Sequence, residues 1–245
     1  MSVKFINTTQ NEFLKKKTLN KYMPLEFALE KIVENYIWFA NPTKWVDPFE
    51  KRFIEGKYLR KGTEIEFPLK GRVFCTCMTE TSTSEAHWNI YSRDQIGISF
   101  TYKRDELLKV LNKLVGYDVY IGKVKYLISK TIEGKLSDID ELKAFNPINI
   151  NDRELQLQLL LLKRKAFEYE NEIRIILIKK DKTKEAGLKI DLNISNDLID
   201  KITIHPSVEN YTEMMLKDLF KVKYGFKKVF KSNLYSMKND ITITV

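Results

Sequence analysis

The sequence predicts an α+β fold, in which helices pack on a mixed, largely antiparallel sheet that is either continuous or split. Hydrophobic residues make up 43% of the chain and aromatic residues 12%, which is enough to build a substantial core. Strand-like and helix-like segments alternate without strict βαβ order, and no linker or repeat divides the chain. We therefore expect residues 1–245 to form a single globular domain.

Strands are predicted where branched and aromatic residues cluster or alternate with polar ones. The segment 172–180 is the strongest example, because isoleucine dominates "EIRIILIKK". Segment 117–128 is expected to bend at Gly122, since glycine weakens a strand interior. The other expected strands are 36–40, 71–79, 95–102, 187–192, 200–206 and 240–245.

Helices are predicted where apolar residues recur at three- and four-residue spacing. Pro24 begins one at 23–36, a serine of "TSTS" (Ser82 or Ser84) caps one at 81–92, and Gly225 ends one at 208–225. The remaining expected helices are 103–115, 137–145 and 151–167, whereas 41–53, with two prolines, is expected to be a loop.

The net charge of the chain indicates which kinds of partner it attracts. Forty-two lysines and arginines against 33 acidic residues give a formal net charge of +9, which attracts polyanions, nucleic acid first. The alternative is a lysine-rich surface that serves solubility alone. No apolar run approaches membrane-spanning length and no signal pattern opens the chain, so we expect a cytoplasmic protein without a membrane partner.

The usual catalytic signatures are absent from the sequence. It lacks the phosphate-binding glycine loops, the zinc-protease motif and the serine-hydrolase elbow. Cys75 and Cys77 stand two apart, a spacing that disfavours a disulfide, and two isolated histidines do not complete a zinc site. We therefore expect reduced cysteines and no resident metal.

Three local clusters remain as candidates for a site. In "WVDPFE", Asp47 begins a turn and Phe49 is an anchor. In "HWNIYS", His87 and Tyr91 share one helix face, and Trp88 and Ser92 share another. The alternatives are a structural turn around a buried Phe49, and a core role for Trp88.

The third cluster is "EYENEIRIILIKK" at 168–180. On a strand, Glu170, Glu172 and Arg174 would share one face. That face is either a solvated edge with a Glu–Arg pair or the acidic wall of a site.

Taken in order, these boxes resemble those of a bacterial family, the domain of unknown function twenty-nine seventy-one. The chain has "NKYMPLEFAL", "YIWFANPTKWVDPFE", "FCTCMT", "HWNIYS", "QIGISF" and "KVKY", followed by Lys163, Phe167, Glu170, Glu172 and Arg174. It departs from the family pattern at three places: Val46 replaces Asn, Asn89-Ile90 replaces Ser-His, and Phe167 replaces Trp.

The layout of the family is in turn similar to that of the ADP-ribosyltransferases. The resemblance implies NAD as substrate, with Glu172 as the carboxylate at the ribose and Glu170 at the acceptor. It implies contacts to NAD from Lys21, Tyr22, Trp88, Tyr91 and Ser92. Asp47, Phe49, Lys163 and Arg174 are expected to support the site, and Tyr22, Trp88, Tyr91 and Glu172 to line one cleft.

The leading hypothesis is thus an NAD-dependent ADP-ribosyltransferase-like effector, a toxin or anti-phage defence protein that modifies nucleic acid or protein. Its partners would be nucleic acid, through the basic surface, and a regulatory protein. The alternative is a nucleic-acid-binding module or a metal-dependent nuclease, in which Glu170, Glu172 and Asp47 would hold Mg²⁺ beside Lys163. A third reading is a non-catalytic interaction domain.

Overall fold

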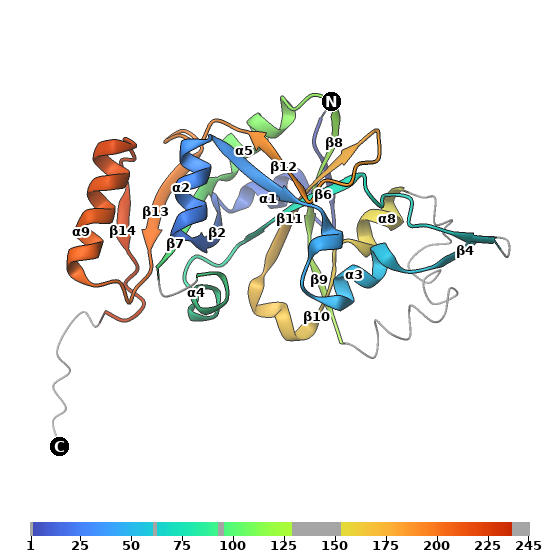
Figure 1. The fold of residues 1–245 in the computed structure, drawn as a ribbon, viewed down its shortest axis with the longest axis horizontal. Coiled ribbons are helices and arrows are strands. Elements are labelled where there is room, and N and C mark those ends of the chain that lie inside the picture. The colour runs from blue at the N-terminus through green and yellow to red at the C-terminus, as the bar shows by residue number, and fades with distance from the viewer. Residues whose placement is uncertain (1, 61–62, 93–95, 129–152, 237–245) are drawn as a thin grey trace, which may run out of the picture. The chain divides into compact units, whose positions relative to one another are not determined.

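The computed structural model describes residues 2–60, 63–92, 96–128 and 153–236. It has the predicted α+β fold: a mixed, largely antiparallel sheet with packed helices (Figure 1). The chain forms two compact units, each built from three separate segments. Unit 1 comprises Met1–Lys17, Tyr36–Glu80 and Arg104–Leu192, and unit 2 comprises Thr18–Asn35, Thr81–Lys103 and Asn193–Val245. That residues 1–245 form one domain stays a prediction.

The sheet of unit 1 is organised around β11 (Glu172–Lys179). This strand pairs antiparallel with β6 (Val73–Thr79) on one side and with β8 (Tyr117–Lys123) on the other. β1 (Lys4–Ile6) adds to β8 in parallel, and β3 (Tyr36–Ala40) joins β6 and β12 (Gly187–Asp191). Every residue of β11 before Lys179 is buried, because the isoleucine-rich strand is central and covered on both faces.

Helices and short strands cover the unit 1 sheet. The helices are α1 (Gln10–Lys15), α3 (Pro48–Glu55), α5 (Arg104–Asn112) and α8 (Arg153–Leu159), with 3₁₀ turns η1 (Pro42–Lys44) and η3 (Lys165–Glu170). β4 (Tyr58–Arg60) pairs with β5 (Thr63–Ile65), and β9 (Lys125–Leu127) pairs in parallel with β10 (Leu162–Arg164). The core joins α3 and the leucines of α8 to the β6 and β11 side chains.

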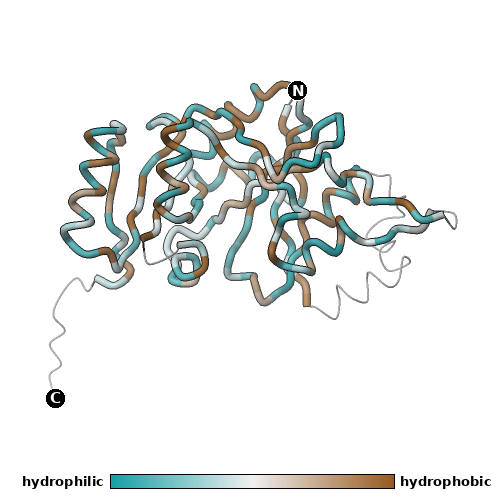
Figure 2. Tube along the Cα trace, in the orientation of Figure 1, coloured by the Kyte–Doolittle hydropathy of each residue, from teal (hydrophilic) through white to brown (hydrophobic). Residues whose placement is uncertain are grey.

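Unit 2 has its own four-stranded arrangement. β7 (Gly97–Lys103) pairs antiparallel with β2 (Thr18–Pro24) and β13 (Ile199–Ile204), and β14 (Val229–Lys231) extends β13 in parallel. Its helices are α2 (Leu25–Val33), α4 (Glu85–Tyr91) and α9 (Asn210–Asp218), and α9 continues into a π-helical turn, η4 (Leu219–Lys223). Figure 2 shows hydrophobic and hydrophilic residues alternating along α9.

Most predicted elements are present, and the boundary predictions for helices were the least accurate. Ser84 caps α4, and Gly225, at a φ of 72°, follows the α9–η4 helix as predicted. The segment predicted as the helix 151–167 instead contains α8, β10 and the first half of η3. The segment predicted as the loop 41–53 contains η1 and most of α3.

The segment 117–128 forms two strands, β8 and β9, with the break at Val124 rather than at Gly122. Gly122 is instead required by packing, because an added Cβ would lie 2.4 Å from a methyl group of the buried Leu161. The predicted helix at 137–145 and strand at 240–245 lie outside the described residues. Within the described ranges, none of the helices has the length and apolar character that a membrane-spanning helix needs.

Candidate functional site

A buried cluster of charges lies at the start of β11 in unit 1. It contains two cations, Lys163 and Arg174, and three carboxylates, Glu50, Glu170 and Glu172. Each of the five is at most 9% exposed. We call these five residues the charge cluster. Among the described residues that compose it, carboxylates outnumber cations by one.

Arg174 is the fixed member of the charge cluster. Its Nε donates to Glu172 at 2.7 Å, and its two terminal nitrogens donate to the Leu160 carbonyl at 2.6 Å and to Glu50. The guanidinium also stacks over the Trp45 ring, 4.4 Å from its centroid. Backbone, carboxylate and aromatic contacts together hold the arginine in one place. The predicted pairing of Arg174 with a carboxylate is confirmed.

Lys163 is held differently. β10 places it so that its Nζ donates to Glu170 at 2.7 Å and to Glu172 at 3.2 Å, and lies 5.1 Å from the Phe167 ring centroid. All of these contacts are made by side chains. Lys163 is therefore the cation of the cluster that can exchange most readily with another positive group.

Glu170 reaches the cluster from a position that the sequence pattern did not indicate. The prediction that Glu170, Glu172 and Arg174 alternate along one strand was wrong for Glu170, which ends η3. Asn171 follows with a φ of 42°, in the left-handed region that asparagine tolerates, and β11 begins only at Glu172. Thr79 fixes this corner by donating to the Glu170 carbonyl at 2.5 Å. Glu172 and Arg174 share a face, as predicted.

The surroundings of Glu172 keep it ionised. Burial alone would raise the pKa of its carboxyl, but the charge and hydrogen bond of Arg174 and the charge of Lys163 lower that pKa to about 2. Burial would lower the pKa of Lys163 and of Arg174, but the carboxylates of Glu172 and Glu50 hold both above their usual ranges. The Glu172 backbone N–H donates to the Tyr126 hydroxyl at 2.8 Å.

The "WVDPFE" box positions Glu50. Asp47 caps α3, accepting from the Phe49 backbone N–H at 2.9 Å, so Glu50 lies in the first turn of that helix. Arg164 spans both residues: it pairs with Asp47 at 3.2 Å and stacks 4.3 Å from the Phe49 ring centroid. Asp47 and Phe49 thus hold Glu50 and Arg164 in place, and their support of a functional site stays a prediction.

A second ion-pair group in unit 1 is a useful comparison. The Glu80 carboxylate pairs with Arg104 at 2.6 Å, Lys16 at 2.9 Å and Lys123 at 3.4 Å. Burial would raise its pKa, but the Arg104 hydrogen bond and the lysines lower that pKa to about 2. Glu80 therefore resembles Glu172 in its lowered pKa, although it is less deeply buried. The described ion pairs of this group contain no second carboxylate.

The predicted aromatic contacts to NAD lie in unit 2. The ring of Tyr22 is 4.7 Å from that of Trp88, edge to face, and 5.0 Å from that of His87, which is 5.9 Å from Tyr91. Trp88 is 1% exposed and packs against His205, so it is a core residue in this structure. Tyr91, 37% exposed, presents the accessible ring.

The other two predicted contacts also belong to unit 2. Lys21 is half-buried on β2, and the buried Ser92 donates its hydroxyl to the Trp88 carbonyl at the end of α4. Glu172 and Glu170 belong to unit 1, so the prediction of a single cleft lined by Tyr22, Trp88, Tyr91 and Glu172 stays a prediction.

Sequence reasoning missed four members of the unit 1 site: Trp45, Glu50, Cys77 and Tyr126. Glu50 could have been found, because it closes the "WVDPFE" box three residues after the capping aspartate. Cys77 pairs in register with Arg174, and its thiol donates a hydrogen bond that helps to lower the Glu172 pKa. Both cysteines are free, as predicted.

The contacts of the acidic side chains are relevant to the hypothesis that this site binds Mg²⁺. Within the described ranges, no group of three or more His, Cys, Asp or Glu side chains is placed to hold a metal ion. Glu170 and Glu172 are instead engaged by Lys163 and Arg174, and Asp47 by Arg164. The chemistry available here is the stabilisation of positive charge by a desolvated carboxylate.

Residues 87–175 match the model of the family described as Protein of unknown function (DUF2971). This match covers most of α4, the described elements from β7 to η3 and the first half of β11. It confirms the resemblance predicted from the ordered boxes, of which those from "HWNIYS" onward lie in the matched residues. No curated protein and no solved structure matches the chain.

Proposed function

We propose that this chain is an NAD-dependent ADP-ribosyltransferase-like effector that modifies nucleic acid or protein, with Glu172 as its catalytic carboxylate. Cleavage of NAD at the bond between nicotinamide and ribose develops positive charge on the ribose. A group that catalyses this step must hold a negative charge close to the ribose and keep it ionised in a dry environment.

The observation that carries the proposal is the excess carboxylate of the charge cluster. Among its described members, three carboxylates face two cations, and Glu172 stays ionised because its pKa is about 2. A buried carboxylate that stays ionised favours a cationic ligand or transition state. It disfavours an anionic one.

The two cations have different roles in the proposed reaction. Arg174, tied to the Leu160 carbonyl, keeps Glu172 oriented throughout. Lys163, tied only by side chains, leaves Glu170 and Glu172 when NAD binds, and its ammonium then neutralises a phosphate of NAD. The ribose takes the vacated position beside Glu172, and Glu170 becomes free to accept a proton from the acceptor.

The test is nicotinamide release from NAD, measured with and without RNA, DNA or cell lysate. Glu172→Gln removes the charge but keeps the shape, so the rate is expected to fall by about a hundredfold or more. Glu80→Gln is the matched control, since it removes a carboxylate of unit 1 whose side chain is also largely shielded from solvent and whose pKa is also lowered to about 2. Full activity in a folded Glu172→Gln protein, or an equal loss in both variants, would refute the assignment.

The alternative of a nucleic-acid-binding module is favoured by a separate observation, the basic part of unit 2 described below. An Mg²⁺-dependent nuclease is the weaker form of that alternative, since the candidate ligands Asp47, Glu170 and Glu172 are each engaged by a cation. Cleavage of RNA or DNA that requires Mg²⁺ and stops with EDTA would replace the transferase proposal.

A further inference from the structure

Unit 2 concentrates the positive charge of the chain in one segment. Residues 217–231, which we call the basic segment, contain six lysines and a single aspartate, so they carry five of the nine net positive charges. The segment runs from the end of α9 through η4 to β14. Such local concentration distinguishes a binding surface from charge that is spread for solubility.

Half of these lysines are available to a ligand. Lys217 and Lys228 pair with acidic neighbours at 2.6 and 2.7 Å. Lys221, Lys223 and Lys227 are exposed and form no ion pair with any residue that the structure describes. The first two lie on the π-helical turn η4, a feature that is frequent at functional sites.

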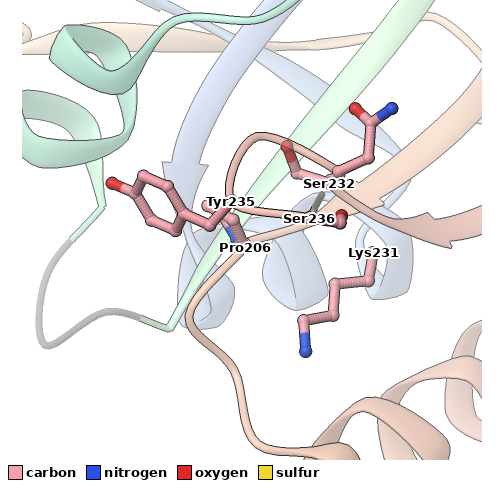
Figure 3. Close-up of a pocket in the computed structure, with 6 residues that line it drawn as sticks. Pro206, Lys231, Ser232, Tyr235 and Ser236 are labelled. Carbon is pink, nitrogen blue, oxygen red and sulfur yellow. The ribbon is translucent and has the colours of Figure 1, made fainter. Parts of the chain in front are cut away.

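A polar pocket of about 260 Å³ adjoins the end of the basic segment. It is lined by Pro206, Lys231, Ser232, Asn233, Tyr235 and Ser236 (Figure 3). The lining therefore offers one ammonium, two hydroxyls and one amide, together with one aromatic ring that is 54% exposed. These are the groups that recognise a phosphate and stack on a base.

The turn that carries these groups is fixed. The Ser232 N–H donates to the Ile204 carbonyl of β13 at 2.9 Å, and the Ser236 N–H closes the turn onto the Asn233 carbonyl at 3.1 Å. The Ser232 hydroxyl oxygen accepts weakly from the Leu234 N–H, so its own proton is free to be donated. Within the described ranges, the one ion pair of Lys231 is a long contact of 3.6 Å to Glu213, so its ammonium can turn to a ligand.

We propose that this pocket binds one phosphate and one base of a single-stranded nucleic acid, whose neighbouring phosphates lie along the lysines of the basic segment. The volume is below the range of pockets that enclose a whole small molecule, so it suits one unit of an extended ligand rather than free NAD. A base can reach the Tyr235 ring only when it is unpaired, which selects a single strand over a duplex.

The proposal names where a nucleic-acid acceptor would be held, and only that role rests on the proposed transferase function. Binding itself is independent of NAD chemistry. It is measured by fluorescence anisotropy with a labelled single-stranded oligonucleotide of mixed sequence, over a series of salt concentrations, with the duplex of the same sequence as comparison.

Lys231→Gln is expected to weaken binding about tenfold and to reduce the salt slope by about 0.7, the value of one phosphate contact on a single strand. Ser232→Ala keeps the charge and is expected to weaken binding about fivefold. Lys57→Gln is the matched control, because it removes the same charge from an exposed site in unit 1. Its affinity is expected to stay within about twofold of wild type.

Absence of binding at low salt would overturn the proposal, as would equal weakening in Lys231→Gln and Lys57→Gln, since charge alone would then explain the affinity. Displacement of the oligonucleotide by free NAD would overturn it too, by making the pocket an NAD site. Oligonucleotide binding by Glu172→Gln, combined with NAD cleavage by Lys231→Gln in the absence of nucleic acid, separates this proposal from the transferase function.

Discussion

The ion pairs of Glu80 predict how Glu80→Gln changes stability and how that change depends on pH. The folded-state pKa of Glu80 is about 2, against an ordinary value of 4.5. At about 1.4 kcal/mol for each pKa unit, this shift corresponds to about 3.5 kcal/mol. Solvent screening at the half-exposed Lys16 and Lys123 reduces the contribution to about 2 kcal/mol of the free energy of unfolding at pH 7. The variant also leaves the guanidinium of Arg104, 1% exposed, without its carboxylate. It should still fold, since typical domains have about 5–15 kcal/mol to lose.

The sign of the pH dependence follows from the lowered pKa. Because the folded state binds the proton more weakly, the stabilisation is complete above the unfolded-state pKa of 4.5 and is lost as the pH falls to about 2. The difference between wild type and Glu80→Gln should therefore shrink from about 2 kcal/mol at pH 7 to about 1 kcal/mol at pH 3.

Urea unfolding of both proteins at pH 7, 5 and 3 measures this difference directly. A difference below about 1 kcal/mol at pH 7, or one that does not change between pH 5 and pH 3, would show that the ion pairs of Glu80 do not act as described. Equal urea dependence of the two proteins is the control for an unchanged unfolding transition.

Three further outcomes are expected. Gly122→Ala should lower the free energy of unfolding by about 1–3 kcal/mol, because the new Cβ would lie 2.4 Å from Leu161; an unchanged urea midpoint would contradict this packing. Iodoacetamide should label only Cys77 in the native protein, since burial raises the pKa of Cys75 to about 12. Modification of Cys75 in the folded protein, detected by mass spectrometry, would contradict its burial. Arg174→Ala should cost about 3–5 kcal/mol by leaving buried carboxylates unpaired, and a melting temperature equal to wild type would argue against its anchoring role.

The sequence predicted elements well where local chemistry and burial agree. β11 was recognisable because its isoleucines favour a strand and also fill a central position in the sheet. Ser84 and Gly225 were recognisable because a cap and a left-handed stop are local requirements of a helix end.

The errors arose where long-range pairing decides the structure. Leu162 and Lys163 follow a leucine-rich helical pattern, yet they pair with β9 and so form a strand. No local signal indicates that pairing. α3 is a different case, because local signals of a helix start were present in the sequence. Asp47 caps the helix and Pro48 lies in its first turn, but the segment was interpreted as a loop.

In the candidate site, too, the features that local sequence determines were predicted and those that depend on long-range contacts were not. Glu172 and Arg174 were predicted to share a face, since strand periodicity requires it. The break at Asn171 is local in origin, but the meeting of Glu170 with Lys163 depends on β10 and η3 lying side by side. Glu50 joins the cluster across more than a hundred residues, which periodicity cannot reveal.

The segmented construction of the two units constrains how the protein can be synthesised and dissected. Unit 1 needs β11 between β6 and β8, so its amino-terminal portions must wait during translation until residues 172–179 have left the ribosome. Unit 2 waits longer, because β13 and β14 come after residue 198. The nascent chain therefore exposes unpaired strands for most of its synthesis, a period in which chaperones are expected to bind it. For the same reason, neither unit can be expressed as one uninterrupted fragment.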